Sequence, residues 1–479
     1  MSTKKNAISG IFWTLIDTLL IKGLAFVTTL ILTDLLSPDD YGLIGLVMVF
    51  VLVGVSLVES GMTASLIRTK SADNADYSTV FFLSLFVAAI IYVIFYFAAP
   101  LIASFYKKDI LTSILRWYCL TFIISAFSSV QLTLMTSKME FKKITKLNIP
   151  AAIIGPVVGI TMGYHGYGVW SLVTMFLVSQ IIQTISFWVF SSWTPSLTFS
   201  VEKAKYHYAF GYKLMLSGLL NTIFTNIYNI IIGKFYSVTL LGFFERSRSF
   251  NEYPTNIITS VISKVTYPLL SNIKNNQEEI ANAYKKILGL SFFVTAPLML
   301  GLAAIAHPLF QLLFKEKWLP AVPYFQIISL ASIFYPIHSI NLNVLKVYGR
   351  TDLFLRLEII KKVMTVIIIT ASLPFGILGL VWSGVVISFI ALLINTYYSA
   401  DMIGYATKRQ LLDMLPTLLS SALMYGLIVI TLYWLKDSSL ISQILISFTV
   451  ALVFYLGANY VLRTTSCMFM IQLIKEYKP

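Results

Sequence analysis

Residues 78–99 of this chain read STVFFLSLFVAAIIYVIFYFAA, a run of 22 residues that contains no Lys, Arg, Asp or Glu. About 20 mainly apolar residues are enough to cross the hydrocarbon core of a bilayer as an α-helix. The whole chain shares this apolar composition: its 479 residues are 57% hydrophobic and 12% charged, whereas a soluble chain is about 25% charged. The sequence therefore predicts an all-α, polytopic membrane protein.

Fourteen apolar segments of this kind follow one another along the chain. We predict membrane spans at residues 11–33, 41–64, 78–99, 112–136, 147–163, 168–190, 210–233, 240–271, 287–306, 321–345, 357–374, 377–400, 414–435 and 440–462. We expect the first to be a retained helix, because it is long enough to span and no small-residue cleavage site follows it. The eighth is long and contains charges and two prolines, so we expect it to be kinked or partly amphipathic.

The distribution of Lys and Arg predicts which way the spans run. Cytoplasmic loops are richer in these residues than outer loops, and fourteen spans place both termini on one side. Of the 35 basic residues, 24 fall on the N-terminal side of the predicted spans, including Arg356, Lys361 and Lys362. The opposite side holds six: Lys107, Lys108, Lys234, Lys315, Lys317 and Lys436. We therefore predict that both termini lie in the cytoplasm.

Two short sequence echoes indicate an internal duplication. At an offset of 200 residues, three pairs coincide: Ser37 and Ser237, Gly42 and Gly242, and Phe50 and Phe250. At an offset of 212, Val169-Trp170-Ser171 matches Val381-Trp382-Ser383. Copies of six spans each would enter the membrane from the same side, as a parallel repeat. We therefore predict two six-helix lobes, residues 1–200 and 201–405, around a central cavity, followed by an appended helix pair and tail at residues 406–479.

Five basic residues lie inside predicted spans: Lys22, Arg116, Arg246, Arg248 and Lys264. Ionisable groups are costly in hydrocarbon and usually face a bundle interior or a watered cavity. Arg also suits bidentate contact with phosphate. We therefore predict that Lys22, Arg246, Arg248 and Lys264 line a cationic cavity for an anionic substrate. Arg116, near the outer end of the fourth span, is better explained as an interfacial anchor.

An alternative explanation of the same charges is structural. Arg246 and Arg248 would then lie in the outer headgroup region and pair with Glu245 and Glu252, while Lys264 would extend its ammonium group to the membrane surface. The sequence leaves both explanations open.

Two carboxylates lie deepest in apolar sequence, Asp17 in the first span and Glu59 in the second. A carboxylate in such surroundings can load and release a proton or Na⁺, so we predict that these residues couple transport to an ion gradient; the alternative is a fixed salt bridge. The seventh span adds Asn221, Asn226 and Asn229, which could hydrogen-bond sugar hydroxyls of a substrate. Contacts between helices are the commoner role of Asn in membranes.

Patterns typical of catalysis or metal binding are missing from the sequence. Cys119 and Cys467 have neither disulfide-framework nor zinc-ligand spacing. The four histidines, at positions 165, 207, 307 and 338, fall at loops or helix ends without ligand spacing. There is no phosphate-binding glycine loop and no Ser/His/Asp arrangement. We therefore predict a protein that is not an enzyme, without cofactor or metal and without a nucleic-acid partner.

Several motifs resemble those of one transporter family. Residues 36–43 read LSPDDYGL and residues 59–67 read ESGMTASLI, which resembles the opening of bacterial polysaccharide transporters. These belong to the multidrug/oligosaccharidyl-lipid/polysaccharide exporter superfamily, and the match is nearest to the branch of colanic-acid and lipopolysaccharide exporters. Later motifs agree in order along nearly the whole chain: SKMEFK at 137–142, GVWS at 168–171, YPLLS at 267–271 and KWLPA at 317–321.

The resemblance implies a two-lobed flippase that moves an undecaprenyl-diphosphate-linked oligosaccharide from the cytoplasmic to the periplasmic leaflet, for synthesis of lipopolysaccharide, capsule or exopolysaccharide. One lobe would rock against the other, with the diphosphate in the cationic cavity and the lipid tail in the bilayer. It also implies residence in the bacterial inner membrane, H⁺ or Na⁺ as coupling ion, and a polysaccharide polymerase and chain-length machinery as partners.

Two other functions stay open on the sequence. A drug or metabolite antiporter of the same superfamily would share the two lobes, but for cationic substrates it should favour acidic cavity groups, and here basic groups outnumber acidic ones in the spans. A polytopic glycan polymerase or ligase would need a long outer loop with catalytic basic residues, and the sequence shows none of adequate length.

Overall fold

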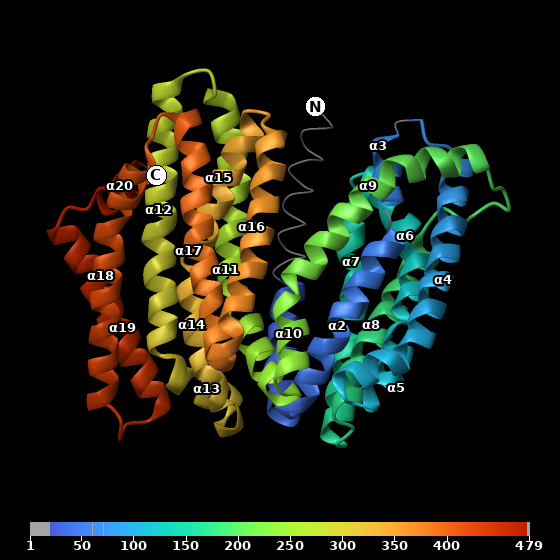
Figure 1. The fold of residues 1–479 in the computed structure, drawn as a ribbon, viewed down its shortest axis with the longest axis horizontal. Coiled ribbons are helices and arrows are strands. Elements are labelled where there is room, and N and C mark those ends of the chain that lie inside the picture. The colour runs from blue at the N-terminus through green and yellow to red at the C-terminus, as the bar shows by residue number, and fades with distance from the viewer. Residues whose placement is uncertain (1–19, 60, 70, 477–479) are drawn as a thin grey trace. The chain divides into compact units, whose positions relative to one another are not determined.

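The computed structural model describes residues 20–59, 61–69 and 71–476, and Figure 1 shows its fold. Throughout these residues the regular elements are helices, and no strand occurs among them. The prediction of an all-α protein is therefore confirmed. The chain packs as two compact units, Met1–Gly242 and Phe243–Pro479.

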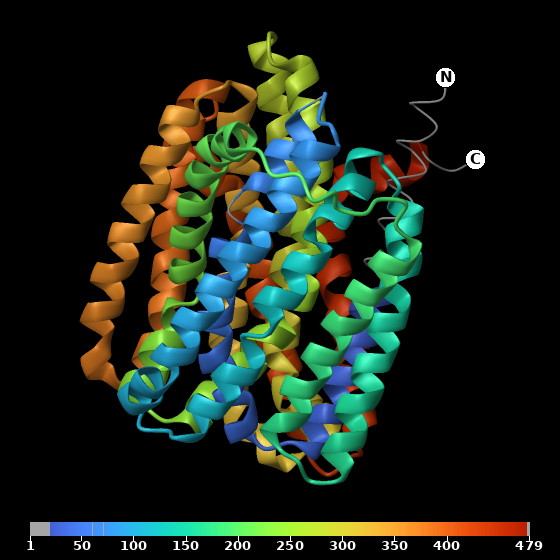
Figure 2. The same ribbon diagram turned by 90° about the vertical axis from the view of Figure 1, so that its right-hand side faces the viewer.

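The first unit begins, within the described residues, with a helical segment at 20–35. It continues with α2 (Pro38–Glu59), α3 (Met62–Arg68), α4 (Asn74–Tyr106), α5 (Ile110–Tyr118), α6 (Thr121–Ser137), α7 (Phe141–Tyr164), α8 (Val169–Phe190), α9 (Val201–Thr225) and α10 (Ile227–Phe235). Figure 2 shows α7 and α8 side by side as a hairpin. Helices α4 and α6 also pack together, and α9 lies against α2 and α3.

Helix α11 (Val238–Ile273) leads from the first unit into the second. The second unit then contains α12 (Gln277–Ala304), α13 (Ala306–Phe314), η1 (Glu316–Ala321), α14 (Val322–Ser332), α15 (Tyr335–Val347), α16 (Thr351–Ser372), η2 (Leu373–Phe375), α17 (Gly376–Ile403), α18 (Thr407–Trp434), α19 (Leu440–Val461) and α20 (Thr465–Glu476). Its core forms where α12, α15, α17 and α18 meet, around the buried side chains of Tyr284, Phe292, Ile337 and Leu392.

Polar side chains cap the starts of α4, α9, α12 and α19. Asp73 precedes α4, and its carboxylate accepts a hydrogen bond from the backbone N–H of Asp76 while the Asp76 side chain binds the Asp73 N–H in return. Such a capping box satisfies two donors that a helix start otherwise leaves open. Single caps by Ser200, Asn276 and Ser439 begin α9, α12 and α19.

The number of membrane-length helices is lower than the predicted number of spans. In the described part of the chain ten helical runs are long and apolar enough to cross a membrane, or eleven if α9 and α10, which meet at a 45° bend, form one span. The first predicted span falls partly on residues 1–19, outside the described residues. Helix α11 is too polar to qualify, and α16 and α17 count as one run although η2 interrupts it. The count of fourteen stays a prediction.

The compact units divide the chain differently from the predicted lobes. We predicted that the second lobe begins at residue 201, yet α9 and α10 pack within the first unit. The boundary between packing units need not coincide with the boundary between duplicated segments, because a duplicated segment can pack against the neighbouring copy. The lobes at 1–200 and 201–405, and the appended segment at 406–479, therefore stay predictions.

The residues of the first sequence echo occupy matching positions at two helix starts. The hydroxyl of Ser37 accepts a hydrogen bond from the Asp40 N–H at 3.3 Å, and the hydroxyl of Ser237 accepts one from the Leu240 N–H at 3.1 Å. The start of α2 also crosses the start of α11 so closely that a Cβ on Gly42 would lie 1.9 Å from the Val238 carbonyl oxygen, and one on Gly242 would lie 1.8 Å from the Pro38 oxygen. The two segments thus contact each other reciprocally.

The two ends of the second unit differ in charge. The connections α11–α12, α15–α16, α17–α18 and α19–α20 lie at its upper end in Figure 1, and the connections η2 and α18–α19 lie at its lower end. Basic residues at or next to the upper connections are Lys274, Lys346, Arg350, Lys408, Arg409 and Arg463. The lower end has Lys315, Lys317 and Lys436. This asymmetry has the form that the positive-inside rule requires.

Candidate functional site

Helix α11 carries four charged residues within eight positions, and Arg248 lies between two of the carboxylates. Its Nη1 is 3.5 Å from Oε1 of Glu245, and its Nε is 3.0 Å from Oε1 of Glu252. These partners stand three and four residues away, the spacing at which side chains on one helix face meet. The Arg248 side chain remains 22% exposed. The pairing that the structural alternative foresees for Arg248 is therefore present.

Arg246 has a different environment from Arg248. Two positions on an α-helix are about 200° apart, and only 6% of the Arg246 surface is exposed. The next residue, Ser247, donates a hydrogen bond to the Ala321 carbonyl at 2.7 Å, and Asn251 donates one to the Ser329 hydroxyl at 2.8 Å. The side of α11 that carries Ser247 and Asn251 is packed against η1 and α14. The two arginines therefore lie on different faces.

Lys264 is placed further along the same helix. It is five helical turns from Arg246, and α11 runs without a break through Pro254. The Lys264 side chain is exposed, in contrast to the buried Arg246. The helix face that we predicted these two residues to share is therefore buried at Arg246 and exposed at Lys264.

Helix α15 adds polar groups to the exposed side of α11. Tyr335 lies within electrostatic reach of Arg248 and Glu252, and its ring centroid is 6.3 Å from that of His338. His338 contacts α17 through both ring nitrogens, with Nε2 3.3 Å from the Ser388 hydroxyl and Nδ1 3.3 Å from Asn395 Nδ2. A row of polar groups therefore runs from α11 over α15 to the buried Ser388 and Asn395 of α17 within the second unit.

An ion pair on α16 lies within electrostatic reach of His338, and sequence reasoning missed it. Lys361 pairs with Glu358 one turn before it, and the Lys361 side chain is 18% exposed. Because α16 begins at Thr351, Lys361 stands about 15 Å along the helix. In the predicted layout of spans, Lys361 counts among the loop charges. Glu358, three residues earlier, is the sequence feature that indicates an ion pair on a helix.

Arg248 of α11 and Lys361 of α16 are each neutralised by neighbouring carboxylates. We define the charged face as Glu245, Arg248, Glu252, Glu358 and Lys361. Its two cations are each paired with carboxylates, so the face is not simply cationic. An anion that binds Arg248 competes with these carboxylates for its guanidinium, and the carboxylates favour release of the anion. Charge exchange of this kind suits a transport site better than a permanent binding site.

The first unit holds the other predicted charged residues. Asp17 lies outside the described residues. Lys22 is exposed on the helical segment 20–35, and Glu59 is the exposed last residue of α2. Gly61, two positions later, has a φ of 65°, which ends the helix there. Glu59 therefore stands at a helix end, and its role in ion coupling stays a prediction.

The asparagines of the seventh predicted span differ in exposure. Asn221 is exposed on α9, whereas Asn226 lies buried at the bend and donates to the Thr222 carbonyl at 2.9 Å. Asn229 on α10 is buried and donates to the Gly45 carbonyl of α2 at 3.2 Å. The hydrogen bond of Asn229 is a contact between helices, the alternative that we weighed for these residues. Substrate binding by the asparagines stays a prediction.

A partly buried cluster at the start of α9 had no sequence signal. His207 is fully buried, with Nδ1 2.8 Å from the Ser65 hydroxyl and Nε2 3.2 Å from Oδ1 of Asp76. Lys203 donates to Asp73 at 2.6 Å and to Asp76 at 2.8 Å. Its ammonium group holds the pKa of Asp73 well below the usual range. We name Ser65, Asp73, Asp76, Lys203 and His207 the α9 anchor.

Metal binding finds no support in the side-chain arrangement. Across the residues that the structure describes, no group of three or more His, Cys, Asp or Glu could hold a metal ion. Both cysteines are buried and unbonded to each other.

Comparison with known sequences links this architecture to polysaccharide synthesis. A family model described as polysaccharide biosynthesis protein matches residues 31–323. The teichuronic acid biosynthesis protein TuaB of Bacillus subtilis (strain 168) is 23% identical over 411 residues, which cover 84% of this chain and 84% of TuaB. The lipopolysaccharide biosynthesis protein WzxC of Escherichia coli (strain K12) is 20% identical over 413 residues, which cover 86% of this chain and 84% of WzxC.

Comparison with solved structures identifies the fold. The lipid II flippase MurJ in an inward closed conformation matches with a TM-score of 0.76 at 17% sequence identity, over 94% of this chain and 99% of MurJ. At this identity the likeness shows the fold alone, so this chain shares the helical architecture of MurJ.

Proposed function

Because the chain belongs to the polysaccharide biosynthesis protein family, we propose that it is a flippase for undecaprenyl-diphosphate-linked oligosaccharide repeat units. It moves each unit from the cytoplasmic to the periplasmic leaflet, where the unit enters lipopolysaccharide, capsule or exopolysaccharide. The observation that carries this proposal is the family match over residues 31–323.

The relatives and the fold support the same step. TuaB and WzxC are named for the synthesis of two different polymers, and the fold is one that MurJ, a lipid II flippase, also has. Synthesis of different polymers can share the transfer of a lipid-linked precursor across the membrane. The short connections between helices also favour a carrier over an enzyme.

The topology of the proposed carrier follows from its charges. The chain resides in the bacterial inner membrane, and both termini and the basic end of the second unit face the cytoplasm. The positive-inside rule supports this orientation. Polysaccharide polymerase and chain-length machinery are the partners that would receive the flipped unit.

The charged face is the part of the second unit that suits the diphosphate. Arg248 can form two parallel hydrogen bonds to a phosphate group, and exchange with Glu245 and Glu252 would let it bind and release. Lys22, Arg246, Lys264 and the asparagines of α9 and α10 complete the set of residues that we propose for substrate. Coupling to H⁺ or Na⁺ through Asp17 and Glu59 belongs to the same proposal.

Cells that lack the protein test the proposed function. We expect the lipid-linked repeat unit to accumulate, with its sugars protected in spheroplasts from a membrane-impermeant lectin, and re-expression of the chain should restore lectin access. Equal lectin access with and without the protein, at equal amounts of lipid-linked sugar, would contradict a flippase.

A further inference from the structure

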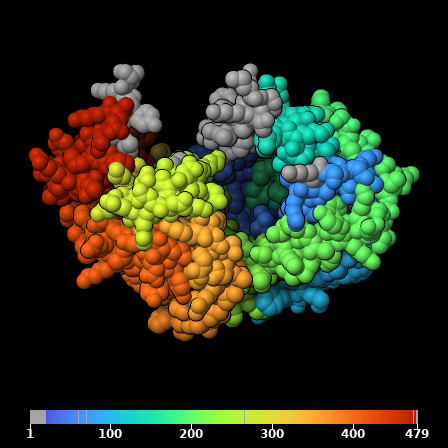
Figure 3. All heavy atoms as spheres, turned by 90° about the horizontal axis from the view of Figure 1, so that it is seen from above, coloured from blue at the N-terminus to red at the C-terminus, as the bar shows by residue number. Residues whose placement is uncertain are grey.

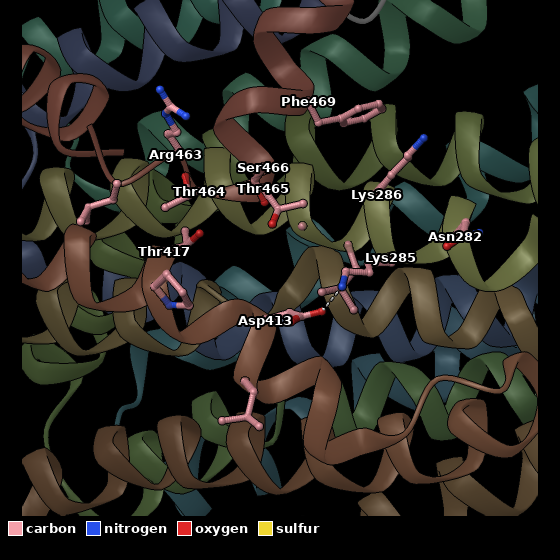
Figure 4. A pocket seen from close by; sticks show the side chains of 15 residues that line it. Asn282, Lys285, Lys286, Asp413, Thr417, Arg463, Thr464, Thr465, Ser466 and Phe469 are labelled. Carbon is pink, nitrogen blue, oxygen red and sulfur yellow. Dashed lines mark ion pairs between the residues drawn. The ribbon is translucent and has the colours of Figure 1, made fainter. Parts of the chain in front are cut away.

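The second unit contains a cavity that no part of the charged face lines. It has a volume of about 610 Å³ and lies between α12, α18, the α19–α20 connection and α20 (Figure 4). The polar side chains that matter for the argument are Lys285, Lys286, Asp413, Arg463, Thr465 and Ser466. We name it the C-terminal cavity.

The C-terminal cavity has an excess of positive charge. Lys285 is compensated, because its Nζ lies 2.8 Å from Oδ2 of Asp413, as the dashed line in Figure 4 marks. Lys286 stacks on an aromatic ring, with Nζ 5.0 Å from the centroid of Phe469. Among the described residues no carboxylate pairs with Lys286 or with the exposed Arg463. Two of the three cations in the lining are therefore available to an anion.

The start of α20 adds hydrogen-bond donors to the same wall. Arg463 has a φ of 46°, a left-handed conformation that turns the chain from α19 into α20. Helix α20 then begins with Thr465 and Ser466, and its first intrahelical bond runs from the Met468 N–H to the Thr464 carbonyl. The first N–H groups of a helix lack intrahelical partners and carry partial positive charge. The hydroxyls and backbone donors at the start of α20 line the same cavity as the two cations, Arg463 on one side and Lys286 on the other (Figure 4). Donors of this kind suit a phosphate oxyanion.

The surroundings of the C-terminal cavity favour a phosphate that carries acyl chains. Leu412 and Leu462 line the cavity and are exposed, and the exposed Leu415, Leu419 and Leu423 continue along α18 at helical spacing. The cavity lies at the basic end of the unit, where α12 begins and the C-terminal helices (red) reach the surface in Figure 3. Basic pockets between membrane helices on the cytoplasmic side bind the head groups of anionic lipids.

From these observations we propose that the C-terminal cavity binds the phosphate head group of an anionic phospholipid in the leaflet that the basic loops face. The first turn of α20 supplies donors to the phosphate, Lys286 and Arg463 supply the positive charge of the lining that attracts it, and the acyl chains lie along the exposed leucines of α18. This site is separate from the charged face, so it stands or falls independently of the proposed flippase activity.

The test is lipid-dependent stabilisation of the purified full chain in a neutral detergent. The probe is phosphatidylglycerol, and phosphatidylcholine and millimolar inorganic phosphate are the comparison ligands. We expect phosphatidylglycerol alone to raise the thermal unfolding midpoint in a saturable way. K286Q/R463Q should need roughly 30-fold more phosphatidylglycerol, since each basic residue contributes about fivefold in affinity at a membrane surface. K274Q/K408Q, which removes two exposed charges from the same end outside the cavity, should titrate like the unmodified chain.

The outcomes separate the possible anions. A response of K286Q/R463Q equal to that of the unmodified chain overturns the proposal, as does an equal loss in K274Q/K408Q. Stabilisation by inorganic phosphate that matches phosphatidylglycerol would indicate a free-phosphate site and overturn the lipid assignment. If K286Q/R463Q does not fold, R463Q takes its place with an expected shift of roughly fivefold, because Arg463 lies on an exposed connection.

Discussion

Arg248 is the residue on which the proposed grip on the diphosphate depends most. It is the cation of the charged face with two carboxylate partners and a partly exposed guanidinium. A charge-assisted hydrogen bond contributes about 1.5–3 kcal/mol, so we expect R248Q to slow flipping at least tenfold. The control R350Q removes a guanidinium that is paired with Asp352 next to a connection, and it should flip within about twofold of the unmodified chain. Unchanged flipping by R248Q at equal protein level would exclude Arg248 from the grip.

The Glu358–Lys361 pair makes a prediction about stability. Breaking an ion pair in a partly buried place leaves one charge uncompensated, whereas removing both charges is often nearly neutral. We therefore expect E358Q to lower the thermal unfolding midpoint in detergent, and E358Q/K361Q to recover most of the loss. Equal losses in the single and double variants would mean that the pair does not stabilise α16.

Sequence reasoning reached the charges of α11 and, in one of its two explanations, the partners of Arg248, but not the partners of His207. The ionisable residues of α11 stand out because they interrupt apolar sequence, and the spacing of Glu245, Arg248 and Glu252 fits one helix face. The partners of His207 cannot be inferred in this way, because Ser65 and Asp76 precede it by 142 and 131 residues. Such contacts are decided by how helices pack.

At the scale of elements, the crossing of α2 and α11 depends on two glycines. A Cβ at Gly42 or Gly242 would fall within 2 Å of a backbone oxygen on the other helix, and backbone cannot move aside without separating the helices. We expect G42A and G242A each to reduce the free energy of unfolding by about 1–3 kcal/mol. The measurement is a lower thermal unfolding midpoint in detergent. Gly218 on α9 has open space around it, so G218A should be neutral or slightly stabilising. Equal midpoints for G42A and G218A would contradict the close crossing.

The α9 anchor gives a prediction with a defined pH dependence. The pKa of Asp73 is lowered in the folded chain, so its contribution is present above the ordinary Asp pKa of about 3.9 and fades as pH falls below it. We expect K203Q to melt at a lower temperature than the unmodified chain, with a difference that stays constant from about pH 8 to pH 5. The matched variant K205Q changes an exposed neighbour on α9 and should leave the melting curve unchanged. A difference that vanishes near pH 6 would show that Asp73 does not contribute through Lys203.

The length of apolar runs predicted most helices, because few backbone structures are stable in the hydrocarbon core of a membrane. A membrane helix must satisfy its own hydrogen bonds, so runs such as residues 78–99 leave little choice, and α4 covers that run. Helix α11 is the informative exception: the sequence predicts a span at 240–271, and the structure has one helix of 36 residues there, but its charges leave it too polar to count among the membrane-length helices of the described chain. The bend of 45° between α9 and α10 had no sequence signal, because no proline or glycine stands at Asn226.

For the whole molecule, the predicted duplication and the observed packing divide the chain at different residues. The sequence echo at offset 200 predicted that residues 37–42 and 237–242 are equivalent, and the structure places both at capped helix starts in reciprocal contact. The packing units nevertheless divide at Gly242 rather than near residue 200. Hydropathy and charge reveal spans and their orientation, whereas the assignment of α9 and α10 to a unit depends on side-chain contacts that a single sequence does not display.

The central claim is that this chain transfers a lipid-linked oligosaccharide across a bilayer, and reconstitution tests it most directly. Vesicles with the purified chain and a fluorescent undecaprenyl-diphosphate oligosaccharide are exposed to a quencher that cannot cross the membrane. We expect the protein to make the inner-leaflet fraction accessible to the quencher, and R248Q to do so at least tenfold more slowly. A quenched fraction that stays at the level of protein-free vesicles, with the chain folded and inserted, would contradict the account.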